Sequence, residues 1–336
     1  MPTPVRATTR VVDPSDEGLL RAWWEVGRAA TADRPLDSWP VWEVSRVALP
    51  QARTDLRLDL LVAEVDGEVV GAAMLVLFRM DNTHLGEVDV WVHPDHRRRG
   101  TGSALLAACE DRARADGRDT LISSVYAPME ADSLGSGFAA RHGYVLASGE
   151  LVKALDLPAS APGWGPLDDE VAAVIDGYRV EVWEDRTPDV RVDDFCALLD
   201  RLLGEIPLGE LDLRPARWDE ARLREGEERA AAAGRLQVVA AAVAPDGHLC
   251  GFTDLRLHRP DPRHASVGAT MVLPEHRGHR LGLAVKLASH RRLLELEPGC
   301  HWVETSNAGM NAPMNAVNQK LGYRSVERCL DVQKRI

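Results

Sequence analysis

Residues 88–114 read VDVWVHPDHRRRGTGSALLAACEDRAR, and this stretch decides which fold the chain can adopt. Apolar and polar residues alternate at its start, which predicts a strand that ends at His93-Pro94, because proline cannot donate to a sheet. A basic, glycine-containing turn follows, and then a helix with an apolar face. A strand, a glycine turn and a helix N-terminus gather free backbone N–H groups, which suits a pyrophosphate. Taken alone, such a turn with three arginines is more often a solvated surface loop than a binding site.

The same pattern occurs twice in the chain. When the numbering is shifted by 180, Pro94 falls on Pro274 and Gly102 on Gly282, and later Gly143-Tyr144 meets Gly322-Tyr323 at an offset of 179. The 336 residues therefore predict a duplicated domain, with a first domain at 1–157, a linker at 158–177 and a second domain at 178–336. Residues 158–165, PASAPGWG, are rich in Pro, Ala, Ser and Gly, so we expect little of this linker to be buried.

Composition narrows the classes of function. The formal charge is -12, from 52 acidic and 40 basic residues, which disfavours a nucleic-acid partner and weakly favours cationic small molecules. The five cysteines form no CxxC pair, so we expect neither a disulfide framework nor a metal site. The N-terminal residues MPTPVRATTR lack an apolar leader, and no segment approaches the length of a membrane span. We expect a cytoplasmic protein, monomeric or homodimeric.

Periodicity predicts the same order of elements in both halves. A first strand is expected at residues 5–12, and Asp13-Pro14 predicts the start of the first helix. Asp66-Gly67 predicts a hairpin turn between two strands. The segment 34–50 carries Trp39 and Trp42, and we interpret it as a loop or short helix over the active face, although both tryptophans could simply be core residues.

Both halves resemble the GNAT (Gcn5-related) N-acetyltransferases. The residues that carry the resemblance are HPDHRRRGTGSALL at 93–106, LPEHRGHRLGLAVK at 273–286, TSNAGMNAPMNAVNQKLGY at 305–323 and the two Gly-Tyr pairs. The resemblance covers nearly the whole chain. It implies an α/β (α+β) fold of two tandem units, each a mixed, mostly antiparallel, splayed sheet flanked by helices. The tandem arrangement is similar to two-domain actinobacterial acetyltransferases of the mycothiol synthase type.

The resemblance also implies an acetyl-CoA-dependent acyltransferase and a cofactor site in each half. In each half, the strand that precedes the glycine turn is called the organising strand, and it includes residues 90–92 in the first half and 270–272 in the second. Backbone amides after the organising strand would hold the pyrophosphate, and the strand would pair with the pantetheine arm. The implied cofactor-binding residues are Val90, Trp91, Val92, Arg97, Arg98, Arg99, Gly100, Thr101, Gly102 and Ser103 in the first half, and Thr270, Met271, Val272, Arg277, Gly278, His279, Arg280, Leu281, Gly282, Asn307 and Asn311 in the second.

The sequence departs from the family pattern at several positions. Arg280 replaces the middle glycine of the second loop, which weakens that loop unless the backbone there stays right-handed. The family's asparagine is present as Asn311, whereas the first half has Asp132. The usual tyrosine acid is missing from both halves, because Ala139 and Asn318 stand at its positions.

Acetyl transfer to an amine needs a neutral amine, so a general base is useful. Glu87 and Asp89, on one face of the organising strand, are the candidates, although they could merely solvate an exposed strand. Their counterparts in the second half are Val267 and Ala269, and only Asp254 or His264 could substitute. We therefore expect transfer in the first half, although the resemblance to mycothiol synthase implies the second.

Three classes of function remain open. The first is an acetyltransferase acting on an amine of a small molecule, a peptide N-terminus or a lysine. The second is a tandem in which one half only binds acyl-CoA, as a structural or regulatory module. The third, a nucleotide phosphate-binding protein, fits poorly because no GK[ST] follows either glycine turn.

Overall fold

The structure, a computed structural model, describes residues 7–336, so Val5 and Arg6 of the predicted first strand lie outside the described residues. The first half contains β1 (Thr8–Val11), α1 (Glu17–Thr31), α2 (Trp42–Ala48), β2 (Leu56–Val65), β3 (Glu68–Phe78), β4 (Leu85–Val92), η1 (Pro94–His96), α3 (Thr101–Ala115), β5 (Thr120–Ala127), α4 (Leu134–Arg141) and β6 (Val145–Asp156). The first helix begins later than Asp13-Pro14 predicts, because the side chain of Asp16 caps it by accepting from Leu19 N.

The second half repeats this order after a helical connection. The connection consists of α5 (Leu157–Ser160), η2 (Ala161–Trp164) and α6 (Gly165–Ala172). The second half contains β7 (Arg179–Glu184), η3 (Asp189–Arg191), α7 (Val192–Glu205), α8 (Glu220–Ala232), β8 (Arg235–Val243), β9 (Leu249–His258), β10 (Asp261–Val272), η4 (Pro274–His276), α9 (Leu281–Leu296), β11 (Trp302–Ala308), α10 (Ala312–Leu321) and β12 (Arg324–Arg335). The predicted mixed fold of two repeated units is confirmed.

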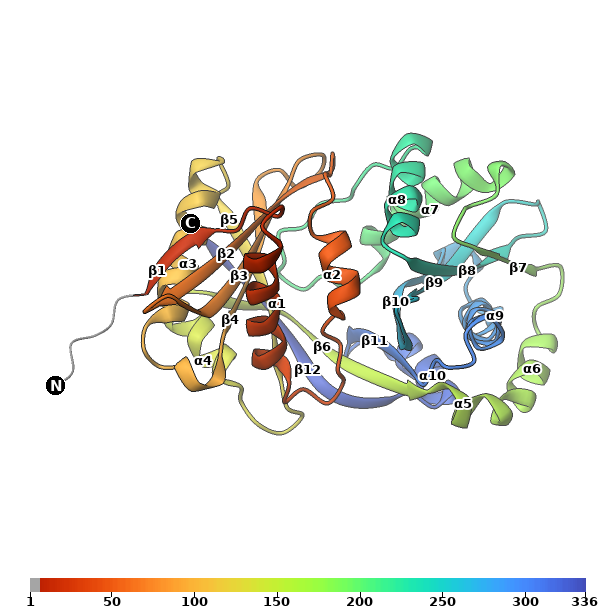
Figure 1. Cartoon of the computed structure of the whole chain (residues 1–336). Helices are drawn as coiled ribbons and strands as arrows, with labels where there is room; N and C mark the ends of the chain where they lie inside the picture. The colour runs from red at the N-terminus through yellow and green to blue at the C-terminus, as the bar shows by residue number, and fades with distance from the viewer. Residues whose placement is uncertain (1–6) are drawn as a thin grey trace.

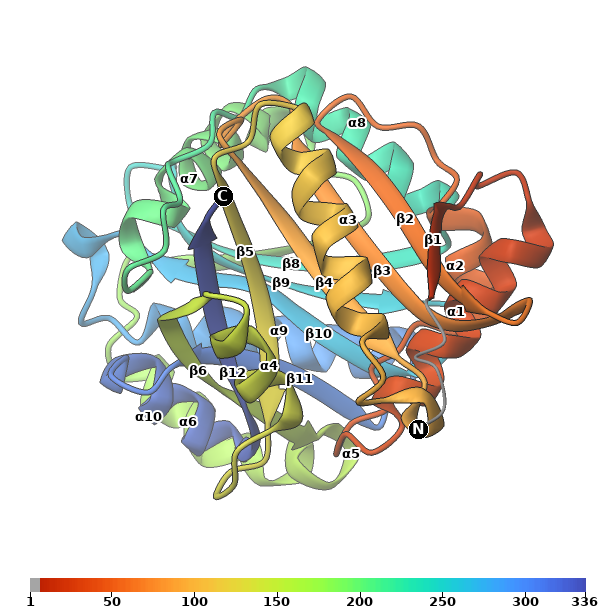
Figure 2. The ribbon, with the colours of Figure 1, turned by 90° about the vertical axis from the view of Figure 1, so that its left-hand side faces the viewer.

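The two halves share one twelve-stranded sheet, in the order β1-β2-β3-β4-β5-β12-β6-β11-β10-β9-β8-β7. Each half gives its last strand to the other half: β6 pairs with β11, and β12 lies between β5 and β6. Figure 1 shows β6 and β12 running between the halves, and Figure 2 shows the dark blue β12 beside β5. A sequence repeat cannot reveal this exchange, since both strands fit either half.

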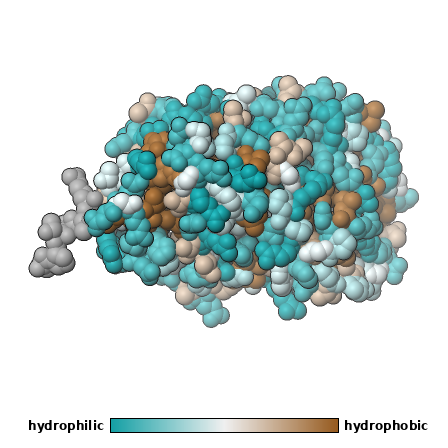
Figure 3. Space-filling view, in the orientation of Figure 1, coloured by the Kyte–Doolittle hydropathy of each residue, from teal (hydrophilic) through white to brown (hydrophobic). Residues whose placement is uncertain are grey.

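Helices cover both faces of the sheet. In the first half, α1 packs on one face around Trp23 and Trp24, and α3 packs on the other around Leu105. Figure 2 shows α3 crossing the strands of this half. In the second half, α7 covers the face that contains Phe252, and α9 covers the face that contains Leu255. Hydrophilic residues predominate on the molecular face in Figure 3.

One residue of the connection between the halves is more buried than its composition predicts. Trp164 is 2% exposed, packs with the core of the second half and donates its indole N–H to Leu321 O. Asp168 forms an ion pair with Arg291 of α9. Trp164 is the single buried residue among residues 158–165, so the expectation that little of this segment is buried holds except at this one large aromatic side chain.

Within residues 7–336, no helix is long and apolar enough to cross a membrane.

Candidate active site

A gap opens between two parallel strands in each half. β5 pairs with β4 only over residues 85–87 of β4, and β11 pairs with β10 only over residues 264–266 of β10. On the opposite edge of the organising strand, His93 N donates to Val70 O of the neighbouring β3. Because backbone groups alternate in direction along a strand, the N–H groups of Val90 and Val92 face the gap instead of a partner strand.

The two loops that follow the organising strands have the same backbone shape. In the first loop, Arg98 and Gly100 have positive φ, at 65° and 90°. In the second loop, Gly278 and Arg280 have positive φ at the corresponding positions, 95° and 56°. Arg280 is therefore left-handed, so the right-handed backbone named as a condition for an intact loop is absent, yet the second loop keeps the shape of the first. Each loop has a glycine at one of its two left-handed positions.

The helices after these loops begin without a side-chain cap. Gly100 and Arg280 are the N-cap residues of α3 and α9, and neither provides a capping side chain. By contrast, the side chains of Asp16, Asp219 and Asn311 cap α1, α8 and α10. The uncapped N–H groups and the helix dipole favour an anion at both loops.

The arginines of the loops have different roles. Arg97 donates to Val92 O and to Ala30 O, and Arg277 donates to Val272 O and to Glu205. These contacts tie each loop to its strand and to the preceding helix, so both side chains hold the backbone in place. Arg98 and Arg99 are exposed beside the first loop.

Several other predicted cofactor residues have side chains that are buried or packed, so only their backbone groups could contact a ligand. The side chains of Thr101, Leu281 and Met271 are buried, at 3%, 2% and 4% exposure. The ring of His279 packs against the ring of Tyr178, with centroids 4.7 Å apart and the ring planes tilted by 39°. The remaining predicted positions, Ser103, Gly102, Gly282, Thr270 and Trp91, lie on the helix starts or the organising strands.

Asn307 and Asn311 have internal partners. Asn311 caps α10, as described above, by accepting from Met314 N. The amide oxygen of Asn307 accepts from Lys153 at 2.6 Å and from Asn318 at 3.0 Å, and its NH2 group donates to Asn315. These bonds account for both side chains without a ligand, so a contact of either with a cofactor stays a prediction.

Glu87 and Asp89 lie half-buried on the face of β4 that α1 covers. Burial, with the negative charge of Glu87 as a second cause, raises the pKa of Asp89 to about 7. Burial and then Asp331 raise the pKa of Glu87 above its usual value. Asp331 comes from the exchanged strand β12 and accepts a hydrogen bond from Ser124 of β5. A carboxyl with a pKa near 7 is well matched to general base catalysis at neutral pH.

The organising strand of the second half differs in its backbone and in its charges. A register shift between Val267 and Ala269 marks a bulge in this strand. Val267 packs on the α9 side of the sheet, whereas Ala269 packs on the opposite side. Only Ala269 therefore lies on the face that carries the two acids in the first half. The N–H of Ala269 donates to the carboxylate of Asp254 at 2.7 Å, and Asp254 also pairs with Arg256. The proposed substitute base, Asp254, is thus already engaged.

The sequence did not point to a pocket between the halves. It has a volume of about 320 Å³ and is lined by Arg34, Trp39 and Tyr126 from the first half, and by His258, His264 and Glu304, among others, from the second. The Arg34 guanidinium lies 3.5 Å from the centroid of the Tyr126 ring and forms a 2.6 Å ion pair with Glu327 of β12. The segment 34–50 thus lines this pocket.

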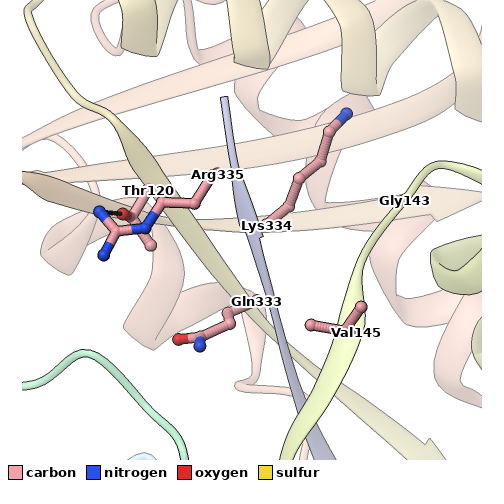
Figure 4. A pocket seen from close by; sticks show the side chains of 6 residues that line it. All are labelled: Thr120, Gly143, Val145, Gln333, Lys334 and Arg335. Carbon is pink, nitrogen blue, oxygen red and sulfur yellow. Dashed lines mark hydrogen bonds between the residues drawn. The ribbon is translucent and has the colours of Figure 1, made fainter.

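A second pocket, of about 340 Å³, lies elsewhere. Its lining includes Thr120, Gly143 and Lys334 (Figure 4). Thr120 begins β5, at the end of the parallel β4–β5 pair opposite to the loop that follows Val92. This pocket is therefore remote from the anion-binding loop, and we assign it no part in the site.

Comparisons with known proteins agree with this arrangement. Residues 23–143 match the model of the acetyltransferase (GNAT) family. A solved tandem GNAT protein from the clavulanic acid biosynthesis pathway is 31% identical, with a TM-score of 0.81 over 98% of each chain. Mycothiol acetyltransferase of Amycolatopsis mediterranei is 29% identical over 286 residues, which is 81% of this chain and 82% of that protein.

A shorter match gives a further relative. The L-amino acid N-acyltransferase MnaT of Escherichia coli is 34% identical over 89 residues, which is 26% of this chain and 52% of that protein. The chain thus spans about half the length of this relative.

The members of the family use acyl-CoA, typically acetyl-CoA. The chain belongs to the GNAT acetyltransferase family, as an N-acyltransferase with two family units in tandem.

Proposed function

We propose that the protein transfers an acetyl group from acetyl-CoA to the amine of a small molecule, and that transfer takes place in the first half. Asp89 carries this proposal, because it combines a pKa of about 7 with a position on the strand that borders the gap. Most amines are protonated near neutrality, and a base of this pKa can accept their proton without being fully protonated itself.

The remaining residues of the first half have supporting roles. The loop N–H groups from Gly100 to Ser103 hold the pyrophosphate, and Arg98 and Arg99 add positive charge. The N–H groups of Val90 and Val92 pair with the amides of the pantetheine arm, and acetyl-CoA supplies the thioester carbonyl that the amine attacks. Asp89 accepts the proton of the amine.

The second half is proposed to bind acyl-CoA without transferring the acyl group. Its loop has the backbone of the first, so the anion site is retained. However, its bulge N–H is taken by Asp254, so no oxyanion donor is available there. Its strand has no free carboxylate, and of the two substitute bases only His264 is not engaged by a hydrogen bond within the described residues. The alternative is transfer in the second half, and the likeness to mycothiol acetyltransferase over 81% of the chain favours it.

A matched pair of variants tests the cofactor assignment. Gly100→Glu and Arg280→Glu place the same negative side chain at the same position of the two loops. Titration calorimetry with acetyl-CoA should give two sites for the wild type and one site for each variant. Only Gly100→Glu should stop CoA release in a screen of small amines, with each product checked by intact mass. Loss of turnover in Arg280→Glu alone would assign transfer to the second half.

A further inference from the structure

The pocket between the halves contains an unusual number of unpaired polar atoms. Four buried polar atoms in its lining have no hydrogen-bond partner among residues 7–336: Trp39 Nε1, His258 Nδ1, His264 Nε2 and Glu304 Oε2. His264 Nε2 lies 3.3 Å from Glu304 Oε2, but the pair lacks hydrogen-bond geometry. Buried polar groups in folded proteins are nearly always paired, so the Trp39 indole N–H, His258 Nδ1 and the poorly aligned His264–Glu304 pair around one pocket indicate a polar occupant.

Two residues of the pocket lining relate it to the proposed base. Asp89 and Trp91 are alternate residues of β4 and therefore share one face of the strand. The ring of Trp91 lies 5.0 Å, centroid to centroid, from the ring of Trp39, which lines the pocket. Tyr126 also lines the pocket, and the charges of both Asp89 and Glu304 act on its hydroxyl. An amine at Asp89 could therefore extend into the pocket.

The charges of the pocket define the occupant further. Arg34 is neutralised by Glu327 and Arg256 by Asp254, so neither presents a free cation. Burial and the neighbouring Arg235 lower the pKa of His258 to about 4, so this ring is neutral. The carboxylate of Glu304 needs a donor, whereas the Trp39 indole N–H needs an acceptor. Hydroxyl groups satisfy both needs, because each donates and accepts.

We propose that the pocket binds the non-reacting part of the acceptor, and that the acceptor is a small polyhydroxylated amine. The second half then serves the reaction of the first by recognising the acceptor through His258, His264 and Glu304. This inference rests on the proposed transfer in the first half. A lysine or N-terminus of a protein fits poorly, because residues of both halves surround the pocket and leave little room for a macromolecule.

Three probe amines test the inference with acetyl-CoA and the full chain: D-glucosamine, cyclohexylamine, which has the same ring size without hydroxyls, and a short peptide with a free N-terminus. D-Glucosamine should have the highest kcat/KM. Trp39→Phe, His258→Phe and Glu304→Gln should raise its KM about 10-fold or more, with kcat within about twofold, because a buried group loses its partner. Trp302→Phe and Glu295→Gln, which change exposed side chains, are the controls.

Each outcome decides something. Turnover of the amines with a KM that all three pocket variants leave unchanged would overturn the inference and leave the proposed function standing. A preference for cyclohexylamine or the peptide would also overturn it. If no amine were acetylated or changed the melting temperature, both the inference and the proposed function would fail. A raised KM together with weaker acetyl-CoA binding would indicate a structural role for the residue instead.

Discussion

The two halves of the molecule have kept one feature in common and diverged in another. Both anion loops place left-handed residues at the same two positions, although a glycine stands first in one and second in the other. The clefts beside them differ in their side chains. The first contains the acids Glu87, Asp89 and Asp331, whereas the organising strand of the second half has Val267 and Ala269 at the positions of Glu87 and Asp89. The duplication thus preserved a backbone shape and changed the side chains around it.

Removal of the proposed base should have the largest effect. Asp89→Asn should lower turnover about 10²–10⁴-fold, with acetyl-CoA affinity nearly unchanged, because the amide cannot accept a proton. The double variant Glu87→Gln, Asp89→Asn should show at least this loss. Steady-state kinetics and titration calorimetry measure the two quantities, and Glu68→Gln, an exposed change on β3, is the control.

The pH profile sharpens this test. The wild-type rate should rise about tenfold per pH unit below pH 7 and level off above it, because Asp89 must be deprotonated to act. In the Asp89→Asn variant this rise in rate below pH 7 should be absent. Full turnover in this variant, combined with its loss in Arg277→Ala or Asn311→Ala, would place transfer in the second half.

Lys286 distinguishes the second half from the first through the pH dependence of the stability of the protein. It is fully buried, and its Nζ has no partner within residues 7–336, whereas Leu106 occupies the same position of α3. Burial, and then Lys153, lower the pKa of Lys286 to about 7. Unfolded lysine titrates near pH 10.4, so between these values the unfolded chain binds a proton that the folded chain does not. Stability should therefore rise with pH over this range.

Lys286→Met should remove that dependence. The variant should be more stable than the wild type at pH 7, and its advantage should shrink toward pH 10 by up to about 1.4 kcal/mol per pH unit. Chemical denaturation at several pH values measures this difference. Leu106→Met in the first half should show no such trend. Parallel curves for Lys286→Met and the wild type would mean that Lys286 is charged in the folded protein.

Exchange of residues between the loops should have the smallest effect. Gly100→Arg should lower the free energy of unfolding by about 1–2 kcal/mol, because a side chain is strained at positive φ. Arg280→Gly removes the same strain from the second loop, so this variant alone should be more stable than the wild type by part of that amount. A Cβ at Gly100 meets no atom within 4 Å, so acetyl-CoA binding should persist in Gly100→Arg. Denaturation midpoints and calorimetry check both points. Lost binding in a folded Gly100→Arg protein would show that the loops are not equivalent.

The sequence was sufficient where the relevant signal is local. The repeat, the organising strand and the loop at Arg97–Gly102 follow from periodicity, proline and glycine, and the structure agrees with them. The left-handed backbone of Arg280 was missed, because a side chain normally disfavours that conformation and only its surroundings impose it.

The rest depended on contacts between distant segments. Asp331 lies 244 residues after Glu87 in the chain, and only the exchange of β12 brings it to the first cleft. The exchange of β12 also brings Glu327 into its ion pair with Arg34. The pocket between the halves combines residues that belong to neither motif, and no spacing in the sequence joins them.

The position of β12 also sets the order in which the chain can complete its fold. This strand lies between β5 and β6, which end by Asp156, yet it consists of residues 324–335. During synthesis the chain emerges from its N-terminus, and domains generally fold as units as they appear. Here the first half keeps an open edge on β5 until residues 324–335 have left the ribosome. Neither half is then a separate folding unit, and the two halves complete their fold together.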